Sequence, residues 1–143
     1  MSKTAIVYWS QTENTKKMAE LIADGAKSAG AEVDLFEVGS TTPDNVSEYD
    51  LIALGCPSMG AEVLEEGEFQ PFYDKLREKL TGKKVALFGS YGWGDGQWMR
   101  DWQSDVVAAG ANLYNGEGFI VNYDPTDGET ENCKNFGSGF ASF

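Results

Sequence analysis

Apolar and polar positions along the chain form blocks that predict strands and helices in alternation. Nearly continuous apolar runs, typical of strands covered on both faces, occupy residues 5–9, 51–55 and 85–88. Two further strands are predicted over residues 32–38 and 113–121, the second interrupted around residues 115–118 by glycines. Apolar spacing predicts helices over residues 18–29, 69–80, 98–109 and 133–143, and Thr42 followed by Pro43 is typical of a short helix start. Five strands alternating with helices predict a parallel sheet with helices on both faces.

Three of these strands break directly into loops of small and polar residues. The loops cover residues 10–15, 56–62 and 89–96. Because the carboxyl ends of parallel strands lie along one edge of an open sheet, the three loops are expected to meet in a ligand crevice. Three such loops at one edge predict a bound cofactor.

Length and charge narrow the class of protein. The chain has 143 residues, of which 41% are hydrophobic, and this predicts a single domain over residues 1–143. With 23 acidic and 11 basic residues, the formal charge of -12 disfavours binding to nucleic acid or to anionic lipid. No secretory signal pattern or membrane-length apolar run is present in the sequence, so a cytoplasmic location is expected.

The cysteines predict neither disulfides nor a metal centre. Cys56 and Cys133 are too few for a disulfide framework, and the sequence contains no histidine that would complete a metal site with them. Cys56 follows a predicted strand beside a candidate ligand loop, which leaves both a functional role and simple packing open. Cys133 is predicted to pack in the core.

The first loop is suited to a phosphate group. Hydroxyl groups and backbone N–H groups converge there at the start of a helix, where unpaired amides and the helix dipole favour an anion. The alternative is that Ser10 and Thr12 only cap the helix. The sequence lacks the Gly-x-x-x-x-Gly-Lys motif of nucleotide hydrolases, and Gln97 replaces the third glycine of a dinucleotide fingerprint. Gly55 and Cys56 also stand where a phosphoacceptor domain has its aspartate.

The third loop is suited to a flat ring. Trp93 lies between Gly92 and Gly94, and glycines allow the backbone to approach a planar ligand closely. The alternative is that Trp93 covers a nearby apolar patch. Met59 in the second loop is either a core residue or an apolar contact to a ring face.

Three segments together resemble flavodoxins. They read VYWSQTENT, LGCPSMGAEVLEE and KKVALFGSYGWGDGQWMRDW, and the match extends over nearly the whole chain, with an ending similar to that of the short-chain group from anaerobic bacteria. The resemblance implies a flavodoxin-like three-layer sandwich with strand order 2-1-3-4-5 and non-covalent FMN. It places the phosphate in the first loop and the flavin between Met59 and Trp93. The cofactor-binding residues implied are Ser10, Gln11, Thr12, Glu13, Asn14, Thr15, Ser58, Met59, Gly60, Ala61, Glu62, Ser90, Tyr91, Gly92, Trp93 and Gly94.

One position departs from the family pattern. Flavodoxins have Thr-Gly-Asn-Thr where this chain has Thr12, Glu13, Asn14 and Thr15. A side chain at residue 13 is unfavourable if the backbone needs a positive φ, and a carboxylate near a phosphate is repulsive. The substitution is expected to affect the affinity for FMN and not the class of cofactor.

The resemblance also implies a function, that of a low-potential one-electron carrier between redox enzymes. After the first reduction, the peptide following Gly60 would turn so that its carbonyl accepts a hydrogen bond from flavin N5, which stabilises the neutral semiquinone. Glu62 would accept a hydrogen bond from flavin N3.

Acidic residues in or beside the loops would disfavour the anionic hydroquinone and attract basic patches of redox partners. They are Glu62, Glu65, Glu66, Glu68 and Asp95. An ordinary solvated acidic face is the alternative for these residues.

Two other functions remain open at this point. One is a two-electron FMN-dependent reductase of a quinone or another small molecule, although no extra segment for a substrate pocket is visible. The other is a non-catalytic binding domain that retains the loops only as turns. A monomer would suffice for a transient carrier.

Overall fold

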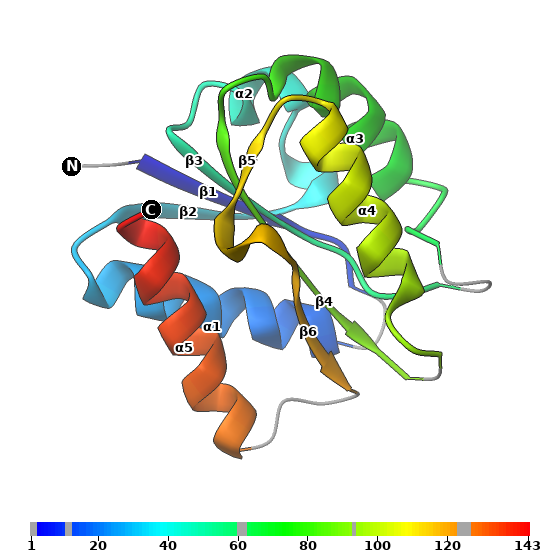
Figure 1. Cartoon of the computed structure of the whole chain (residues 1–143). Coiled ribbons are helices and arrows are strands. Elements are labelled where there is room, and N and C mark those ends of the chain that lie inside the picture. Colours follow the sequence, from blue (N-terminus) through cyan, green and yellow to red (C-terminus); the bar gives the residue numbers. More distant parts are fainter. Residues whose placement is uncertain (1–2, 11–12, 60–62, 93, 123–126) are drawn as a thin grey trace.

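A parallel sheet forms the centre of the molecule. The computed structural model describes residues 3–10, 13–59, 63–92, 94–122 and 127–143. Its strands are β1 (Lys3–Tyr8), β2 (Glu32–Glu37), β3 (Leu51–Gly55), β4 (Lys84–Tyr91), β5 (Asn112–Leu113) and β6 (Phe119–Asn122). They are ordered β2-β1-β3-β4-β5, with β6 also paired to β4 (Figure 1). This arrangement confirms the predicted three-layer architecture and strand order.

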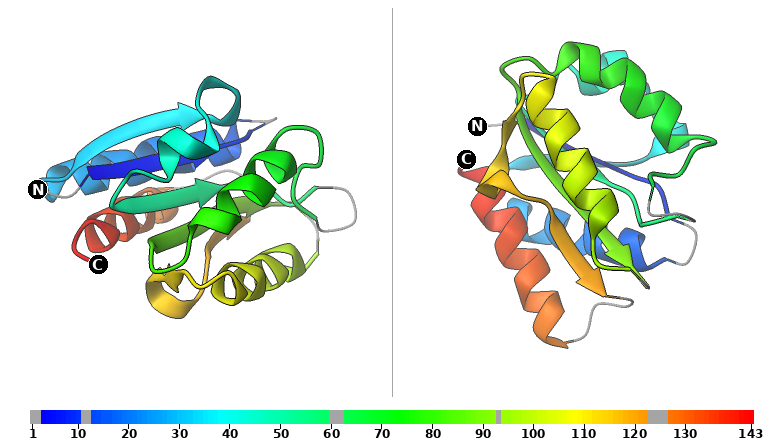
Figure 2. Two further views of the ribbon diagram at one scale, coloured as in Figure 1. Left: turned by 90° about the horizontal axis from the view of Figure 1, so that it is seen from above. Right: turned by 45° about the vertical axis from the view of Figure 1, so that its right-hand side comes forward.

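Helices cover both faces of the sheet (Figures 1 and 2). On one face lie α1 (Asn14–Ser28) and α5 (Asp127–Ala141), side by side. On the other lie α2 (Pro43–Val46), α3 (Phe69–Leu76) and α4 (Gln97–Ala108). Short 3-10 turns η1 (Val38–Ser40), η2 (Arg77–Lys79) and η3 (Tyr114–Gly116) complete the connections.

The sheet separates two apolar cores. Ala5 and Val7 of β1 point to the core under α3 and α4, which includes Phe69 and Trp102, whereas Ile6 points to the core under α1 and α5. This alternation of buried side chains on both faces explains why the sequence of β1 is apolar throughout.

Several predicted helix ends are confirmed. The Thr42 hydroxyl accepts a hydrogen bond from the Asn45 amide at 3.1 Å, and Pro43 occupies the first turn of α2. Gly30 and Gly110 follow α1 and α4 with φ of 94° and 93°, a conformation in which glycine carries no steric penalty.

Four predicted boundaries were wrong, one of them the start of α1, which lies at Asn14 and not at residue 18. β4 continues to Tyr91, so Ser90 and Tyr91 end a strand and do not belong to a loop. The helix predicted over residues 69–80 is α-helical only to Leu76, after which η2 continues it, and α5 begins six residues earlier than predicted, at Asp127.

The fifth strand is divided, as the glycines predicted. β5 pairs with the beginning of β4 and β6 with its end, so the two short strands share one neighbour. The chain between them turns at Asn115 and Gly116, which have φ of 63° and 70°. Both ends of β4 are therefore covered by a parallel partner on the same side.

Helices α1 and α5 approach each other unusually closely. A Cβ atom added at Gly25 would collide with the backbone carbonyl of Lys134, and one added at Gly137 would collide with the carbonyl of Ile22. These glycines allow backbone to contact backbone. Gly137 lowers the intrinsic helix propensity of α5, and the close packing on α1 explains why glycine stands there.

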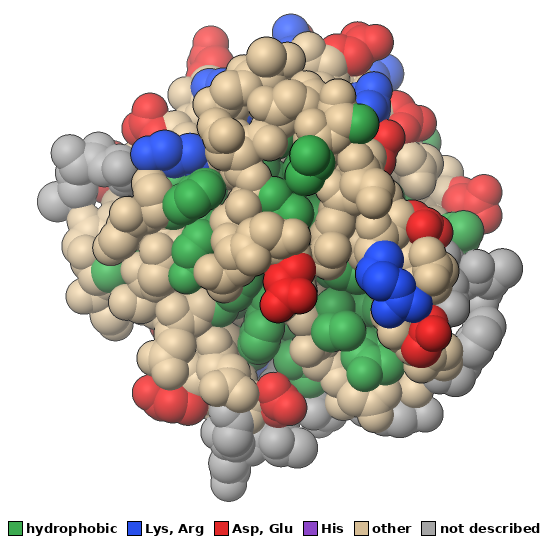
Figure 3. All heavy atoms as spheres, viewed as in Figure 1, with side chains coloured by type: hydrophobic (Ala, Val, Ile, Leu, Met, Phe, Trp, Pro, Cys, Tyr) green, Lys and Arg blue, Asp and Glu red, His purple; other side chains and the backbone are tan. Residues whose placement is uncertain are grey.

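The surface carries scattered charge. On the face seen in Figure 3, apolar side chains gather towards the middle, and acidic groups lie both among them and around them. Among the helices of the described residues, none has the length and apolar character of a membrane span.

Candidate cofactor site

The loops after β1 and β3 leave the sheet where its strand order reverses. β1 and β3 are neighbours in the sheet, yet the chain passes from β1 to β2 on one side and from β3 to β4 on the other. The loops therefore diverge and leave a crevice between them, the usual ligand position in such sheets. The Trp9 amide, which donates to the Gly55 carbonyl at 3.0 Å, holds the two strand ends together.

The first loop turns into α1 through a residue with strained backbone. Glu13 is the N-cap of α1 and has φ of 71°, and its side chain makes no capping hydrogen bond. The Ser10 hydroxyl accepts the Lys16 N–H at 3.3 Å and so lies over the first helical turn. The start of α1 and the Ser10 hydroxyl form a donor set suited to a phosphate. The concern about a positive φ at residue 13 is confirmed.

A buried hydroxyl pair joins the start of α1 to the end of β4, next to the first and third loops. The Oγ1 atom of Thr15 lies 3.0 Å from Oγ of Ser90, and the Ser90 amide also donates to Thr15 Oγ1 at 3.3 Å. Both side chains are almost fully buried. The start of α1 is thereby fixed to the end of β4.

We expect Ser90→Ala to lower the free energy of unfolding by about 1–3 kcal/mol, because the buried Thr15 hydroxyl loses its side-chain partner. Thr15→Val combined with Ser90→Ala should cost less than the sum of the two single changes. Urea unfolding of the four proteins in this cycle measures the coupling, and strictly additive effects would contradict it.

The outgoing arm of the second loop, residues 58–59, is attached to the end of β4. The Ser58 amide donates to the Ser90 carbonyl at 3.0 Å. Met59 and Val63 then form an antiparallel bridge, with N–H to O distances between their backbones of 2.9 and 3.0 Å. Ser58 and Met59 are half-buried at this edge, where a ligand ring could contact them.

The third loop is held by two residues that sequence reasoning did not single out for the site. Asn122, at the end of β6, donates from Nδ2 to the carbonyls of Tyr91 and Gly92, both at 3.2 Å. The Trp98 indole lies 5.6 Å from the Tyr91 ring and donates to the Cys56 carbonyl at 3.2 Å. Gly94 has φ of 91°, which favours glycine at this point of the loop.

The position of Asn122 could not be found from sequence. Its role depends on the pairing of β6 with the end of β4, and no local pattern indicates that register. Trp98 was recognised only as an apolar residue of a helix face.

Six predicted site residues lie outside the described part of the chain, and their contacts stay predictions. They are Gln11, Thr12, Gly60, Ala61, Glu62 and Trp93. The structure brings the other ten to one edge of the sheet, on the three loops or directly beside them.

Both cysteines are buried. Burial raises the pKa of the Cys56 thiol to about 12, and it raises that of Cys133 to about 12 as well. Cys133, on α5, packs in the core under α1 and α5, as predicted. Cys56 Sγ accepts the Glu65 N–H at 3.4 Å, so this thiol makes a structural contact with the second loop.

We therefore expect neither thiol to react with an alkylating reagent in the native protein at pH 8, because the reactive thiolate is almost absent below the raised pKa values. Mass spectrometry after iodoacetamide treatment checks this. Both cysteines should react once the chain is unfolded in urea, and rapid native labelling would contradict the expectation.

The acidic residues near the loops are engaged in different ways. Glu68 accepts a hydrogen bond from the Trp9 indole at 3.3 Å, and Asp95 forms an ion pair with Arg100 at 3.0 Å. Glu66 is exposed, and no hydrogen bond or ion pair is found for it among the described residues. The predicted acidic edge is therefore partly neutralised at Asp95.

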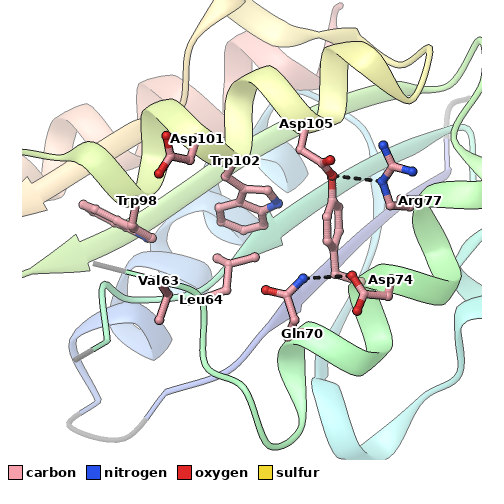
Figure 4. A pocket seen from close by; sticks show the side chains of 10 residues that line it. Val63, Leu64, Gln70, Asp74, Arg77, Trp98, Asp101, Trp102 and Asp105 are labelled. Carbon is pink, nitrogen blue, oxygen red and sulfur yellow. Dashed lines mark hydrogen bonds and ion pairs between the residues drawn. The ribbon is translucent and has the colours of Figure 1, made fainter. Parts of the chain in front are cut away.

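A separate groove of about 420 Å³ lies between α3 and α4 (Figure 4). Leu64, Trp98 and Trp102 contribute apolar lining, and Asp74, Asp101 and Asp105 contribute acidic lining. The guanidinium group of Arg77 is already paired with Asp105 at 2.9 Å. Its acidic lining makes this groove unsuited to a phosphate, so the strand ends are the better candidate for the cofactor site.

The fold and the loops together define a class of protein, the doubly wound α/β proteins that bind a ligand at the carboxyl ends of the strands of a parallel sheet. The family model described as "Flavodoxin" matches residues 6–137. The chain belongs to the flavodoxin family.

Individual relatives agree with this assignment. The chain is 47% identical to the flavodoxin of Clostridium beijerinckii over 137 residues, covering 96% of this chain and 98% of that protein. It is 45% identical to the flavodoxin of Megasphaera elsdenii over 136 residues, covering 95% and 96%. The solution structure of the two-electron reduced Megasphaera elsdenii protein superimposes with a TM-score of 0.89, covering 98% of this chain and 99% of that one.

Membership in the family establishes the cofactor and the general role. The protein binds FMN and transfers electrons, and it is not an enzyme. The residues of the site fit this cofactor, because a helix start with adjoining hydroxyls suits its phosphate and the half-buried Met59 and Tyr91 suit its ring.

Proposed function

We propose that this protein is a low-potential carrier of single electrons between redox enzymes, acting in the cytoplasm as a single-domain monomer. The observation that carries the proposal is that three loops leave the sheet side by side, at the carboxyl ends of β1, β3 and β4. The buried pair of Thr15 and Ser90 links the first of these strand ends to the third. FMN supplies the redox chemistry, and the protein supplies position, hydrogen bonds and charge.

Different residues are proposed to contact different parts of the cofactor. The first loop, residues 10–15, would hold the phosphate, and Met59 and Trp93 would contact the two faces of the flavin. The remaining contacts are assigned to Ser58, Gly60, Ala61, Glu62, Ser90, Tyr91, Gly92 and Gly94. Partners would approach this edge with basic patches, since the chain carries a net charge of -12.

Stepwise anaerobic reduction of the protein with added FMN, followed by visible absorption, tests this function. Accumulation of half-reduced flavin before full bleaching is expected of a one-electron carrier. Direct two-electron bleaching would instead favour a reductase, and failure to bind FMN would contradict the assignment of the site.

Gly60→Pro examines the proposed role of the Gly60 peptide in the same experiment. We expect less half-reduced flavin at the midpoint of reduction, because proline restricts the backbone freedom that the family mechanism needs. A folded, FMN-bound variant with an unchanged yield of half-reduced flavin would refute this role.

A further inference from the structure

The side chain of Glu65 binds three backbone amides. Its Oε1 atom accepts the N–H groups of Glu68 at 2.7 Å and of Phe69 at 2.8 Å, and Oε2 accepts that of Gly67 at 2.7 Å. Burial acts to raise the pKa of Glu65, but these three hydrogen bonds outweigh it and lower the pKa below its usual value. The side chain is therefore a carboxylate that organises the turn leading into α3.

The main chain of Glu65 is also fixed. Its N–H group donates to the Cys56 sulfur at 3.4 Å, and its carbonyl accepts the Gln70 N–H at 2.8 Å. The preceding residue, Leu64, is buried in the core that contains Trp98 and Trp102, and Figure 4 shows it directed towards Trp102. Glu65 thus connects three segments: the end of β3, the start of α3, and the arm by which the second loop returns to the fold, residues 63–65, here called the return arm.

The outgoing arm of the second loop, residues 58–59, is anchored to β4. Ser58 is attached to β4 through the Ser90 carbonyl, and the Met59–Val63 bridge joins the two arms. Displacement of the return arm would move Val63, and through the bridge it would move Met59. The position of Met59 therefore depends on anchors at both ends, one of which is Glu65.

We propose that Glu65 is a positioning residue for FMN, which holds the return arm of the second loop so that Met59 meets the flavin in one arrangement. The inference rests on the proposed function of this loop. Glu65 acts through the backbone and not by contact with the cofactor.

The chain contains a matched control for the effect of charge. Glu66 is adjacent and exposed, and no hydrogen bond is found for it within the described ranges. Glu66→Gln and Glu65→Gln remove the same charge from neighbouring positions, but only the second removes a ligand of three amides. Glu65→Asp keeps the charge and shortens the side chain, so it tests whether the carboxylate must reach the three amides.

The experiment compares wild type with Glu65→Gln, Glu65→Asp and Glu66→Gln. Three quantities are measured at constant pH and salt: the dissociation constant for FMN, the yield of half-reduced flavin at the midpoint of reduction, and amide hydrogen exchange of the apoprotein. Circular dichroism establishes that each variant is folded.

We expect Glu65→Gln to weaken FMN binding about tenfold and to halve the yield of half-reduced flavin, because charge-assisted hydrogen bonds to the carboxylate are lost. Amides of residues 67–69 should exchange about tenfold faster. Glu65→Asp should show the same changes at smaller size, and Glu66→Gln should stay within about twofold of wild type, as expected for one screened charge.

Two results would overturn the proposal. If Glu65→Gln and Glu66→Gln shift affinity and half-reduced yield equally, Glu65 acts only by its charge. If exchange rises at residues 67–69 while binding and yield stay at wild-type values, Glu65 is only a helix cap. Failure of the wild type to bind FMN or to be reduced in single steps would instead count against the proposed function.

Discussion

Gly137→Ala is expected to lower the free energy of unfolding by about 3 kcal/mol, the upper end for overpacking of a well-packed interior. The added methyl group would collide with the backbone carbonyl of Ile22 in α1, and backbone of a packed helix has little room to yield. Alanine has the higher helix propensity, by about 1 kcal/mol, so propensity alone predicts the opposite sign. Gly25→Ala, which meets the Lys134 carbonyl from the other side, should behave similarly.

Gly139→Ala provides the control for this prediction. It lies in the same helix, but its added methyl group would meet the hydroxyl end of the Tyr114 side chain and not the backbone of a packed helix. We expect its stability to stay within about 1 kcal/mol of wild type, since propensity offsets the displacement. Urea unfolding monitored by far-UV circular dichroism measures both variants. Equal effects at residues 137 and 139 would show that close helix contact is not the cause.

Glu13→Gly is expected to stabilise the protein and to tighten its binding of FMN. A non-glycine residue at a φ of 71° carries a conformational strain of roughly 1 kcal/mol, which glycine removes. Removal of the carboxylate beside the proposed phosphate position should also lower the dissociation constant by about tenfold, corresponding to about 1.4 kcal/mol. Thermal unfolding of the apoprotein and fluorescence titration with FMN measure the two effects.

Glu13→Gln separates strain from charge, because it keeps the side chain and removes the carboxylate. It should reproduce the gain in FMN affinity and leave the stability of the apoprotein near wild type. Raising the salt concentration should reduce the difference in affinity between Glu13→Gln and wild type. A Glu13→Gly variant with unchanged affinity would mean that residue 13 points away from the phosphate.

Local signals predicted the elements whose causes are local. The apolar runs of β1 and β3 follow from burial on both faces, and Thr42 with Pro43 marks the start of α2 through its own hydrogen bond. The strain at Glu13 was also accessible, because comparison with the family motif showed a glycine replaced.

The remaining features depend on contacts between distant segments. Ser90 and Thr15 form a pair across 75 positions, and Asn122 reaches the third loop only because β6 pairs with the end of β4. The role of Glu65 was missed for a different reason. Its signal is a glutamate just before Gly67 and a helix start, but in a chain rich in acidic residues it was grouped with the surface charge.

The pairing of β6 with β4 has a consequence for folding during synthesis. Asn122 holds the carbonyls of Tyr91 and Gly92, and α5 covers the side of α1 that the sheet does not cover. A ribosome-bound chain that ends before β6 would therefore expose the side of α1 that packs on α5, and it would lack the Asn122 contacts to the third loop. The edge proposed to hold FMN is completed only after β6 leaves the exit tunnel, so the nascent chain is expected to acquire its cofactor after translation has passed this strand.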